Sequence, residues 1–170
     1  MIMPGTVIGK TLNYGYPGQI SRHGDEISRT RAIKKGTDKI PFGYAVKVNE
    51  DGTIQLMGNG DTADNFAGVA MRRVKMAYEY PNQSFAYYLD TEPCDVLERG
   101  TVTVECVNGT PAVGTPVHVY IADSGNKKAG QFAAAADGSN TVELKSAKWA
   151  TSGKDARNVA EIVLMYRQGV

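Results

Sequence analysis

The sequence predicts an all-β protein, an antiparallel β-barrel or sandwich body that carries an extended N-terminal arm. Short apolar runs alternate with polar residues at a period of two, which is the pattern of half-buried strands. Turn-forming residues separate these runs at roughly 8–12-residue spacing, as in small barrels and sandwiches. The 170 residues include 19 glycines and 7 prolines, a composition that favours turns over long helices.

A chain of this length makes about one domain, and we expect it to divide into an arm, residues 1–39, and a barrel, residues 40–170. The arm has neither helical nor strand periodicity. Tyr14, Tyr16 and Ile20 are apolar residues with no apolar partner nearby in the sequence, and residues 21–26 are polar. We therefore expect the arm to become ordered only against another surface, with these three side chains as anchors.

The barrel begins with a predicted hairpin. Residues 44–48 and 53–57 alternate apolar and polar side chains, and the Asp-Gly pair in residues 49–52 between them is a strong hairpin turn. Residues 68–73 form the third predicted strand. Residues 94–97 lead into a predicted turn at residues 98–100, and the strands that follow are predicted at residues 101–106, 116–121, 131–133, 141–144 and 159–166.

The formal net charge of +1 argues against a general nucleic-acid coat protein and against a polybasic membrane binder. This balance conceals an uneven distribution, because residues 1–39 carry +4, residues 40–126 carry −6 and residues 127–170 carry +3. A positive arm and a negative middle can attract further copies of the chain or a neighbouring protein with charged patches. The same distribution is also compatible with an ordinary solvated surface.

The sequence contains neither the pattern of a secretory signal nor an apolar run near the ~20 residues of a membrane helix, so we expect no membrane association. Cys94 and Cys106 are the only cysteines. Two cysteines cannot build a disulfide-rich scaffold, and we expect both to be free thiols in a reducing cytosol.

Two motifs in the arm partly match known ligand-binding motifs, one for phosphate and one for a metal ion. Residues 5–11 approach a phosphate-binding loop, but the spacer is one residue short and no strand precedes it. His23 lies beside Asp25 and Glu26, yet a metal site needs three or four converging ligands, so we expect these residues to form a solvated polar turn. We expect no cofactor and no metal.

Candidates in the barrel are equally incomplete. His118 could activate a cysteine, but Cys106 has the parity of a buried residue. Residues 61–65 are acidic without the ligand spacing of a calcium loop, and Asp90, Glu92, Asp95 and Glu98 are expected on a solvated face. The tyrosines at positions 78, 80, 87 and 88 favour packing or subunit contact over base stacking.

Several segments occur in an order typical of one family. They are residues 15–20 (GYPGQI), 25–29 (DEISR) and 40–46 (IPFGYAV), followed by 93–104 (PCDVLERGTVTV), which has the form of a V-x-x-x-G-x-V-x-V hairpin. Residues 117–119, 123–125 and 160–164 also fit. Together they resemble the structural cement proteins of tailed bacteriophages, and the similarity extends over nearly the whole chain.

The resemblance implies a protein without catalytic activity that binds the outer surface of a phage head, usually as a trimer. Such proteins bridge neighbouring major capsid proteins and stabilise the head against the pressure of the packaged DNA. The chain would then be located on the virion, after assembly in the host cytoplasm, with no direct contact to nucleic acid. The expected contact residues in the arm are Tyr14, Tyr16, Pro17, Ile20, Arg22, Ile27, Arg29 and Arg31. The alternative reading is a virion β-sandwich module that binds carbohydrate on the host surface.

Overall fold

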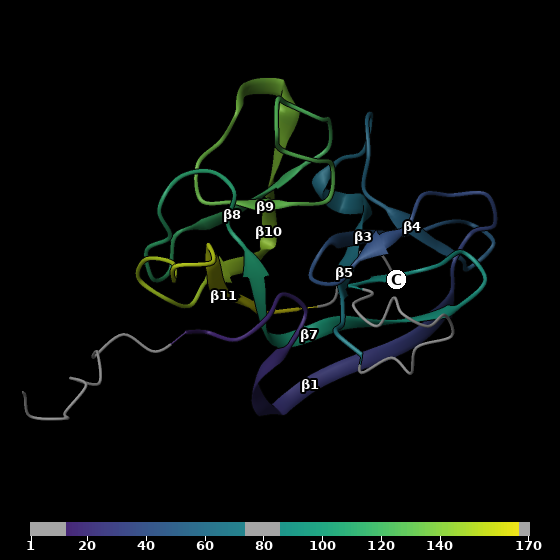
Figure 1. The fold of residues 1–170 in the computed structure, drawn as a ribbon, viewed down its shortest axis with the longest axis horizontal. Coiled ribbons are helices and arrows are strands. Elements are labelled where there is room, and N and C mark those ends of the chain that lie inside the picture. The colour runs from purple at the N-terminus through teal and green to yellow at the C-terminus, as the bar shows by residue number, and fades with distance from the viewer. Residues whose placement is uncertain (1–12, 74–85, 167–170) are drawn as a thin grey trace, which may run out of the picture.

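Nine strands form one curled antiparallel sheet in the computed structural model, which describes residues 13–73 and 86–166 (Figure 1). Eight of the strands follow the order β4-β3-β5-β7-β11-β10-β8-β9, and β1 pairs with β7 alongside this path. The nine strands are β1 (Ile20–Ala32), β3 (Ala45–Val48), β4 (Ile54–Leu56), β5 (Phe66–Ala70), β7 (Pro93–Glu105), β8 (Pro116–Tyr120), β9 (Phe132–Ala133), β10 (Thr141–Trp149) and β11 (Val159–Leu164).

A second, two-stranded sheet pairs β2 (Ile40–Pro41) with β6 (Tyr87–Tyr88). Helical structure in the described residues is confined to two 3-10 turns, η1 (Ala63–Asn65) and η2 (Gly138–Asn140). Within residues 13–73 and 86–166, no helix has the length and apolar character that a membrane span requires.

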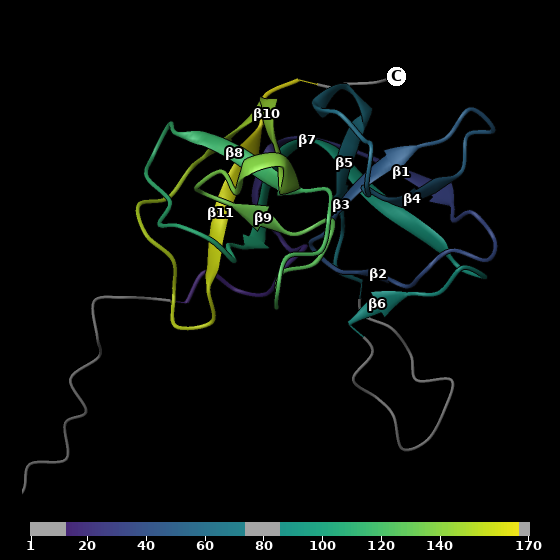
Figure 2. The same cartoon turned by 90° about the horizontal axis from the view of Figure 1, so that it is seen from above.

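The half of the sheet that contains β8 to β11 curls back onto the end of β7 (Figure 2). Cys106, next to β7, forms a bridge with Phe132 of β9, and the Val107 N–H donates to the Phe132 carbonyl at 2.9 Å. The predicted all-β fold with antiparallel, barrel-like curvature is therefore confirmed.

Strand β7 runs between two hydrophobic cores. The larger core lies inside the curled half and includes Val102 and Val104 of β7, whereas the smaller core includes Cys94 and Val96. Both cysteines are buried free thiols, as predicted. Because β7 contributes to both cores and pairs with β1, β5 and β11, it is the structural centre of the molecule.

The predicted turn at residues 98–100 was wrong, because β7 continues through it for 13 residues. Glycine at position 100 suggested a turn, and Gly100 does have a positive φ of 118°. The strand uses this conformation to change partners: Leu97 pairs with Val69 of β5, and Gly100 pairs with Leu164 of β11. The hairpin predicted for residues 44–57 is confirmed as β3 and β4.

The arm was expected to be ordered only against another molecule, and this expectation was wrong for residues 20–32. They form β1, which lies antiparallel beside β7 of the same chain (Figure 1). Apolar periodicity could not predict this strand, because nearly all its residues are exposed and backbone pairing with charged side-chain contacts holds it. The proposed division at residue 39 falls in the exposed segment between β1 and β2, and it remains a prediction.

Candidate interface formed by the N-terminal arm

Residues 16–20 attach the arm to the barrel through the backbone. The Gly18 N–H donates to the Thr103 carbonyl at 2.7 Å, and the Thr103 N–H donates to the Gln19 carbonyl at 3.0 Å. The Thr103 hydroxyl donates to the carbonyl of Tyr16 at 2.6 Å, and the Arg72 N–H donates to the carbonyl of Gly18 at 2.7 Å. This segment therefore joins β7 to the chain that follows β5.

Two glycines meet at this attachment point. A Cβ on Gly18 would lie 2.8 Å from the Ala70 carbonyl oxygen, the Arg72 nitrogen and the Gly43 nitrogen. A Cβ on Gly43 would lie 2.6 Å from Pro17 Cβ and 2.8 Å from the Gly18 nitrogen. Both glycines also have positive φ angles, near 80°. Only glycine allows the two backbones to approach this closely.

Side chains around Gly18 complete the attachment. Ile20 packs against the larger core, and the Tyr16 ring lies 4.5 Å from the guanidinium carbon of Arg72 and 5.0 Å from that of Arg157. Tyr16 and Ile20, which have no apolar partner nearby in the sequence, thus find partners in distant parts of the same chain. Tyr16 helps to attach the arm, and 49% of its surface remains exposed for contact with another molecule.

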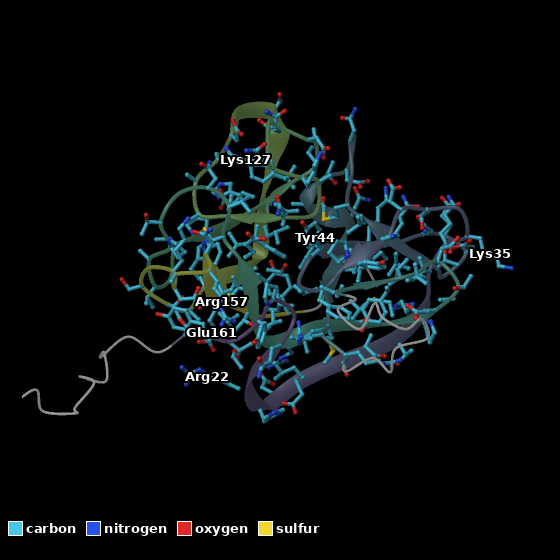
Figure 3. All side chains as sticks on the ribbon, viewed as in Figure 1. Arg22, Lys35, Tyr44, Lys127, Arg157 and Glu161 are labelled. Carbon is cyan, nitrogen blue, oxygen red and sulfur yellow. The ribbon has the colours of Figure 1, made fainter. Side chains whose placement is uncertain are left out.

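Glu161 of β11 is covered by the arm. Its Oε1 accepts hydrogen bonds from the Ser21 hydroxyl at 2.7 Å and from Arg22 Nε at 3.0 Å. The Glu161 side chain is 6% exposed, whereas that of Arg22 is 74% exposed. Figure 3 places Arg22, Glu161 and Arg157 at the same end of the molecule. Arg22 thus pairs with a buried carboxylate while most of its surface faces solvent.

The middle of β1 contains an irregular turn of charged residues. Glu26 accepts from His23 Nδ1 at 3.1 Å and from the Gly24 N–H at 2.6 Å, and these hydrogen bonds lower the pKa of Glu26. Asp25 accepts from Arg99 at 3.1 Å. The two acidic side chains of β1 are therefore engaged by neighbours in the same chain. His23, Asp25 and Glu26 form the polar turn that the sequence suggested as an alternative to a metal site.

Glu98 is the second buried carboxylate beneath the arm. Its side chain is 1% exposed, and its two oxygens lie 3.4 Å from Arg31 and 3.6 Å from Arg29. Glu98 was expected on a solvated face, which was wrong because β1 covers that part of β7. A buried carboxylate needs such partners, since an unpaired buried charge is strongly destabilising.

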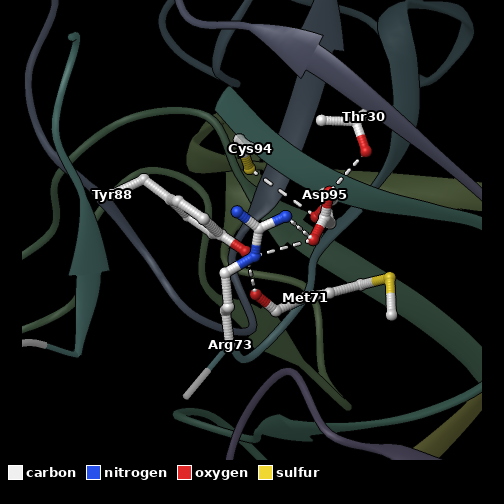
Figure 4. Close-up of polar contacts among 6 residues, drawn as sticks. All are labelled: Thr30, Met71, Arg73, Tyr88, Cys94 and Asp95. Atoms are coloured by element: carbon white, nitrogen blue, oxygen red, sulfur yellow. Dashed lines mark hydrogen bonds and ion pairs between the residues drawn. The ribbon is translucent and has the colours of Figure 1, made fainter. Parts of the chain in front are cut away.

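A third acidic residue, Asp95, connects the other face of β1 to the barrel (Figure 4). Asp95 Oδ1 accepts from the Thr30 hydroxyl at 2.6 Å, and Oδ2 accepts from Arg73 Nε at 3.0 Å. This hydrogen bonding raises the pKa of Arg73. Nearby, the Tyr88 hydroxyl donates to the Met71 carbonyl at 2.7 Å, and burial raises the pKa of Tyr88. The positive arm is therefore matched in part by acidic residues of its own barrel.

The predicted contact residues thus occupy different environments. Tyr14 and Ile27 are exposed, Pro17 is half-buried against Gly43, and Arg22, Arg29 and Arg31 hold buried carboxylates. Sequence reasoning missed Gly43, Thr103, Glu98 and Glu161. A glutamate inside the apolar run of residues 159–164 was a usable indication, because such a residue needs a buried partner.

The remaining candidate residues either contact neighbours within the fold or lie outside the described residues. Residues 5–11, Tyr78 and Tyr80 lie outside the described residues. Burial raises the pKa of the Cys106 thiol, which disfavours the nucleophilic thiolate. The histidine considered as its partner, His118, has its Nε2 atom 4.0 Å from Oε2 of Glu143. Asp61 accepts from Lys47 at 2.7 Å and from the Gly58 N–H at 2.7 Å, which stabilises its own turn. In the described part of the chain, no three His, Cys, Asp or Glu residues form a potential metal-binding group.

Comparison with known proteins gives a consistent result. The family model described as "XM1 gp53 minor capsid protein" matches residues 5–164. A chain from the solved structure "The capsid of Myoviridae Phage XM1" is similar with a TM-score of 0.68 and 16% sequence identity, covering 95% of this chain and 98% of that chain. No curated protein matches.

Proposed function

This chain belongs to the XM1 gp53 minor capsid protein family, and on that premise we propose that it is a cement protein of a tailed-phage head. Membership of the family makes it a structural capsid protein of the virion. In the proposed function, it binds the outer surface of the head, bridges neighbouring major capsid proteins and stabilises the shell against the pressure of the packaged DNA.

The arm is the single observation that carries this proposal. Residues 16–20 are attached to the barrel by backbone hydrogen bonds around the buried Gly18, whereas β1 extends along its side with most of its residues exposed. An extended strand fixed at one end offers a long contact surface for few residues. Contacts that are weak individually become strong when many copies bind one shell.

We assign no catalytic step to the protein. The support is the structural role of the family, together with the packing of the titratable residues considered above. Cys106 is buried, and the carboxylates of Glu98 and Glu161 form ion pairs with arginines. In this proposal, the buried thiol and the two paired carboxylates stabilise the fold and take no part in catalysis.

The proposed assembly is a trimer. Its support is the cement-protein resemblance and the uneven charge of the chain, with a positive arm and a negative middle. The structure uses part of that charge internally, since Arg22, Arg29 and Arg31 pair with Glu161 and Glu98. The solution mass of the isolated protein tests this part of the proposal.

Heads assembled without this protein provide the functional test. Purified protein is added back, its copy number per head is measured, and the temperature at which the heads release DNA is followed. Saturable binding at a fixed ratio to the major capsid protein and a higher release temperature are expected. Heads that fail to bind the protein, or bind it with no gain in stability, would overturn the cement function.

A further inference from the structure

Strand β1 has a second edge, opposite the edge that pairs with β7. Among the described residues, β7 is the only strand that pairs with β1. In an antiparallel pair, alternate residues direct their N–H and C=O groups toward the partner and the remaining residues direct theirs away. The outward groups of β1 therefore form a template for another strand.

The regular part of this edge is short and well defined. Residues 28–32 pair with residues 97–93 of β7 without a register shift, whereas irregularities interrupt the strand before Ser28. Beyond Ala32, Ile33 forms a parallel bridge with Ile54, which ends the open edge. At the other end, Ile27 still pairs with Arg99, and the residue skipped between this pair and the pair of Ser28 with Leu97 is Glu98 of β7, so the accessible template on β1 extends from Ile27 to Ala32.

This six-residue edge is positively charged. It contains Arg29 and Arg31 and no acidic residue, and the two arginines lie on the same face of the strand as the exposed Ile27. Arg29 leaves 46% of its side chain exposed although it contacts Glu98. The acidic residues earlier in β1 are occupied, Asp25 by Arg99 and Glu26 by His23. A partner strand thus meets a row of cationic and apolar side chains.

The charges discriminate between possible occupants. In antiparallel pairing of two copies about Arg29, that residue would lie opposite itself, and pairing about Thr30 would place Arg29 opposite Arg31. Like charges directly opposite each other destabilise a strand pair. A strand with carboxylates at alternate positions would instead face both arginines with opposite charge.

We propose that the outer edge of β1, from Ile27 to Ala32, accepts by strand addition an extended segment of a capsid protein that carries acidic residues at alternate positions. This inference rests on the proposed cement function and adds the mode of attachment and the chemistry of the partner. The backbone of β1 provides the hydrogen bonds, and Arg29 and Arg31 select the acidic face.

Residue-resolved hydrogen exchange tests the mode of attachment. In the free protein, the amides of residues 27–32 that point toward β7 exchange slowly, and those that point away exchange fast. On heads, the outward amides become at least ~10-fold slower, since a new backbone hydrogen bond protects them. Firm binding to heads without this protection would overturn strand addition and leave the cement function standing, whereas absence of binding would overturn both. Equal protection in concentrated free protein would identify a second copy as the occupant and overturn the acidic partner.

A charge variant tests the chemistry of the partner. Arg29→Gln removes one exposed charge and leaves Arg31 to hold Glu98, so the fold is retained. We expect roughly 3–10-fold weaker binding to heads at low salt, and a smaller difference at high salt where charges are screened. Lys128→Gln is the matched control, because Lys128 pairs with Asp123 on the exposed loop after β8. Equal affinity of both variants would contradict an acidic partner.

Discussion

Two parts of the arm contact the same strand, β7, in opposite ways. Residues 16–20 are joined to Thr103 and Arg72 by backbone hydrogen bonds, and Gly18 lies against Gly43 with no room for a side chain. Residues 27–32 run beside residues 93–99 with exposed side chains, and their arginines reach the buried Glu98. The first part depends on the absence of side chains, and the second depends on their charge.

The two parts of the arm therefore have different roles: residues 16–20 attach the arm to the barrel, and residues 27–32 form the edge that a partner can contact. Close backbone packing at residues 16–20 fixes where the arm leaves the barrel and does not require a partner molecule. The charged strand leaves one edge unpaired among the described residues and keeps 46% of the Arg29 side chain in solvent, whereas Arg31 is mostly buried against Glu98. In the proposed cement function this arrangement is useful, since charged edge strands resist self-pairing before the partner is bound.

The largest effect is expected where the attachment is densest. Gly18→Ala adds a Cβ 2.8 Å from three backbone atoms at a φ of 82°, and we expect the free energy of unfolding to fall by about 3 kcal/mol or more. Chemical denaturation measures this change. Gly24→Ala is the matched control, since Gly24 also has a positive φ but nothing within 4 Å of the added Cβ. Gly24→Ala should cost only about 1–2 kcal/mol from backbone strain. Equal losses would show that the close contact of residues 16–20 contributes little.

An intermediate effect is expected at the charged strand. Glu98→Gln keeps the size of the side chain but removes the charge that pairs with Arg29 and Arg31. Because Arg29 is half in solvent and screened, we expect a loss of about 1–3 kcal/mol in the free energy of unfolding. Asp123→Asn at an exposed ion pair is the control and should change stability little. A negligible change for Glu98→Gln would mean that charge does not hold β1 on the barrel.

The smallest effect concerns the ring over the attachment point. Tyr16→Leu retains apolar bulk but loses the contacts with Arg72 and Arg157, and we expect about 0.5–1 kcal/mol of destabilisation. Thermal unfolding of this variant is compared with that of Tyr14→Leu. Tyr14 contacts the barrel through its backbone N–H, which donates to Asp155. If the two variants unfold at the same temperature, the ring contributes nothing to attachment.

The sequence predicted the barrel well because its strands have one buried face. In the predicted strand at residues 116–121, the apolar residues Val117, Val119 and Ile121 occur at every second position, and all three lie in the larger core. β7 was divided in error because glycine at position 100 is ambiguous: positive φ serves a turn and a change of strand partner equally. Local patterns cannot distinguish these two uses.

The arm shows the opposite limit. Its strand β1 lacks a buried apolar face, so periodicity could not reveal it, and its partners Glu98 and Glu161 are 67 or more positions away in the sequence. The positive charge of the arm was visible in the sequence, but its pairing with these two carboxylates depends on the fold. The glycines of the arm were visible too, but the sequence did not show that Gly18 fixes the arm to the barrel through close backbone contact.

A cryo-EM map of a phage head that carries this protein tests the central claim most directly. The account predicts density for the protein on the outer surface where major capsid proteins meet, with residues 16–20 on their own barrel and a capsid strand along the outer edge of β1. A protein located on the inner surface, or one whose β1 faces solvent while other surfaces contact the shell, would contradict it.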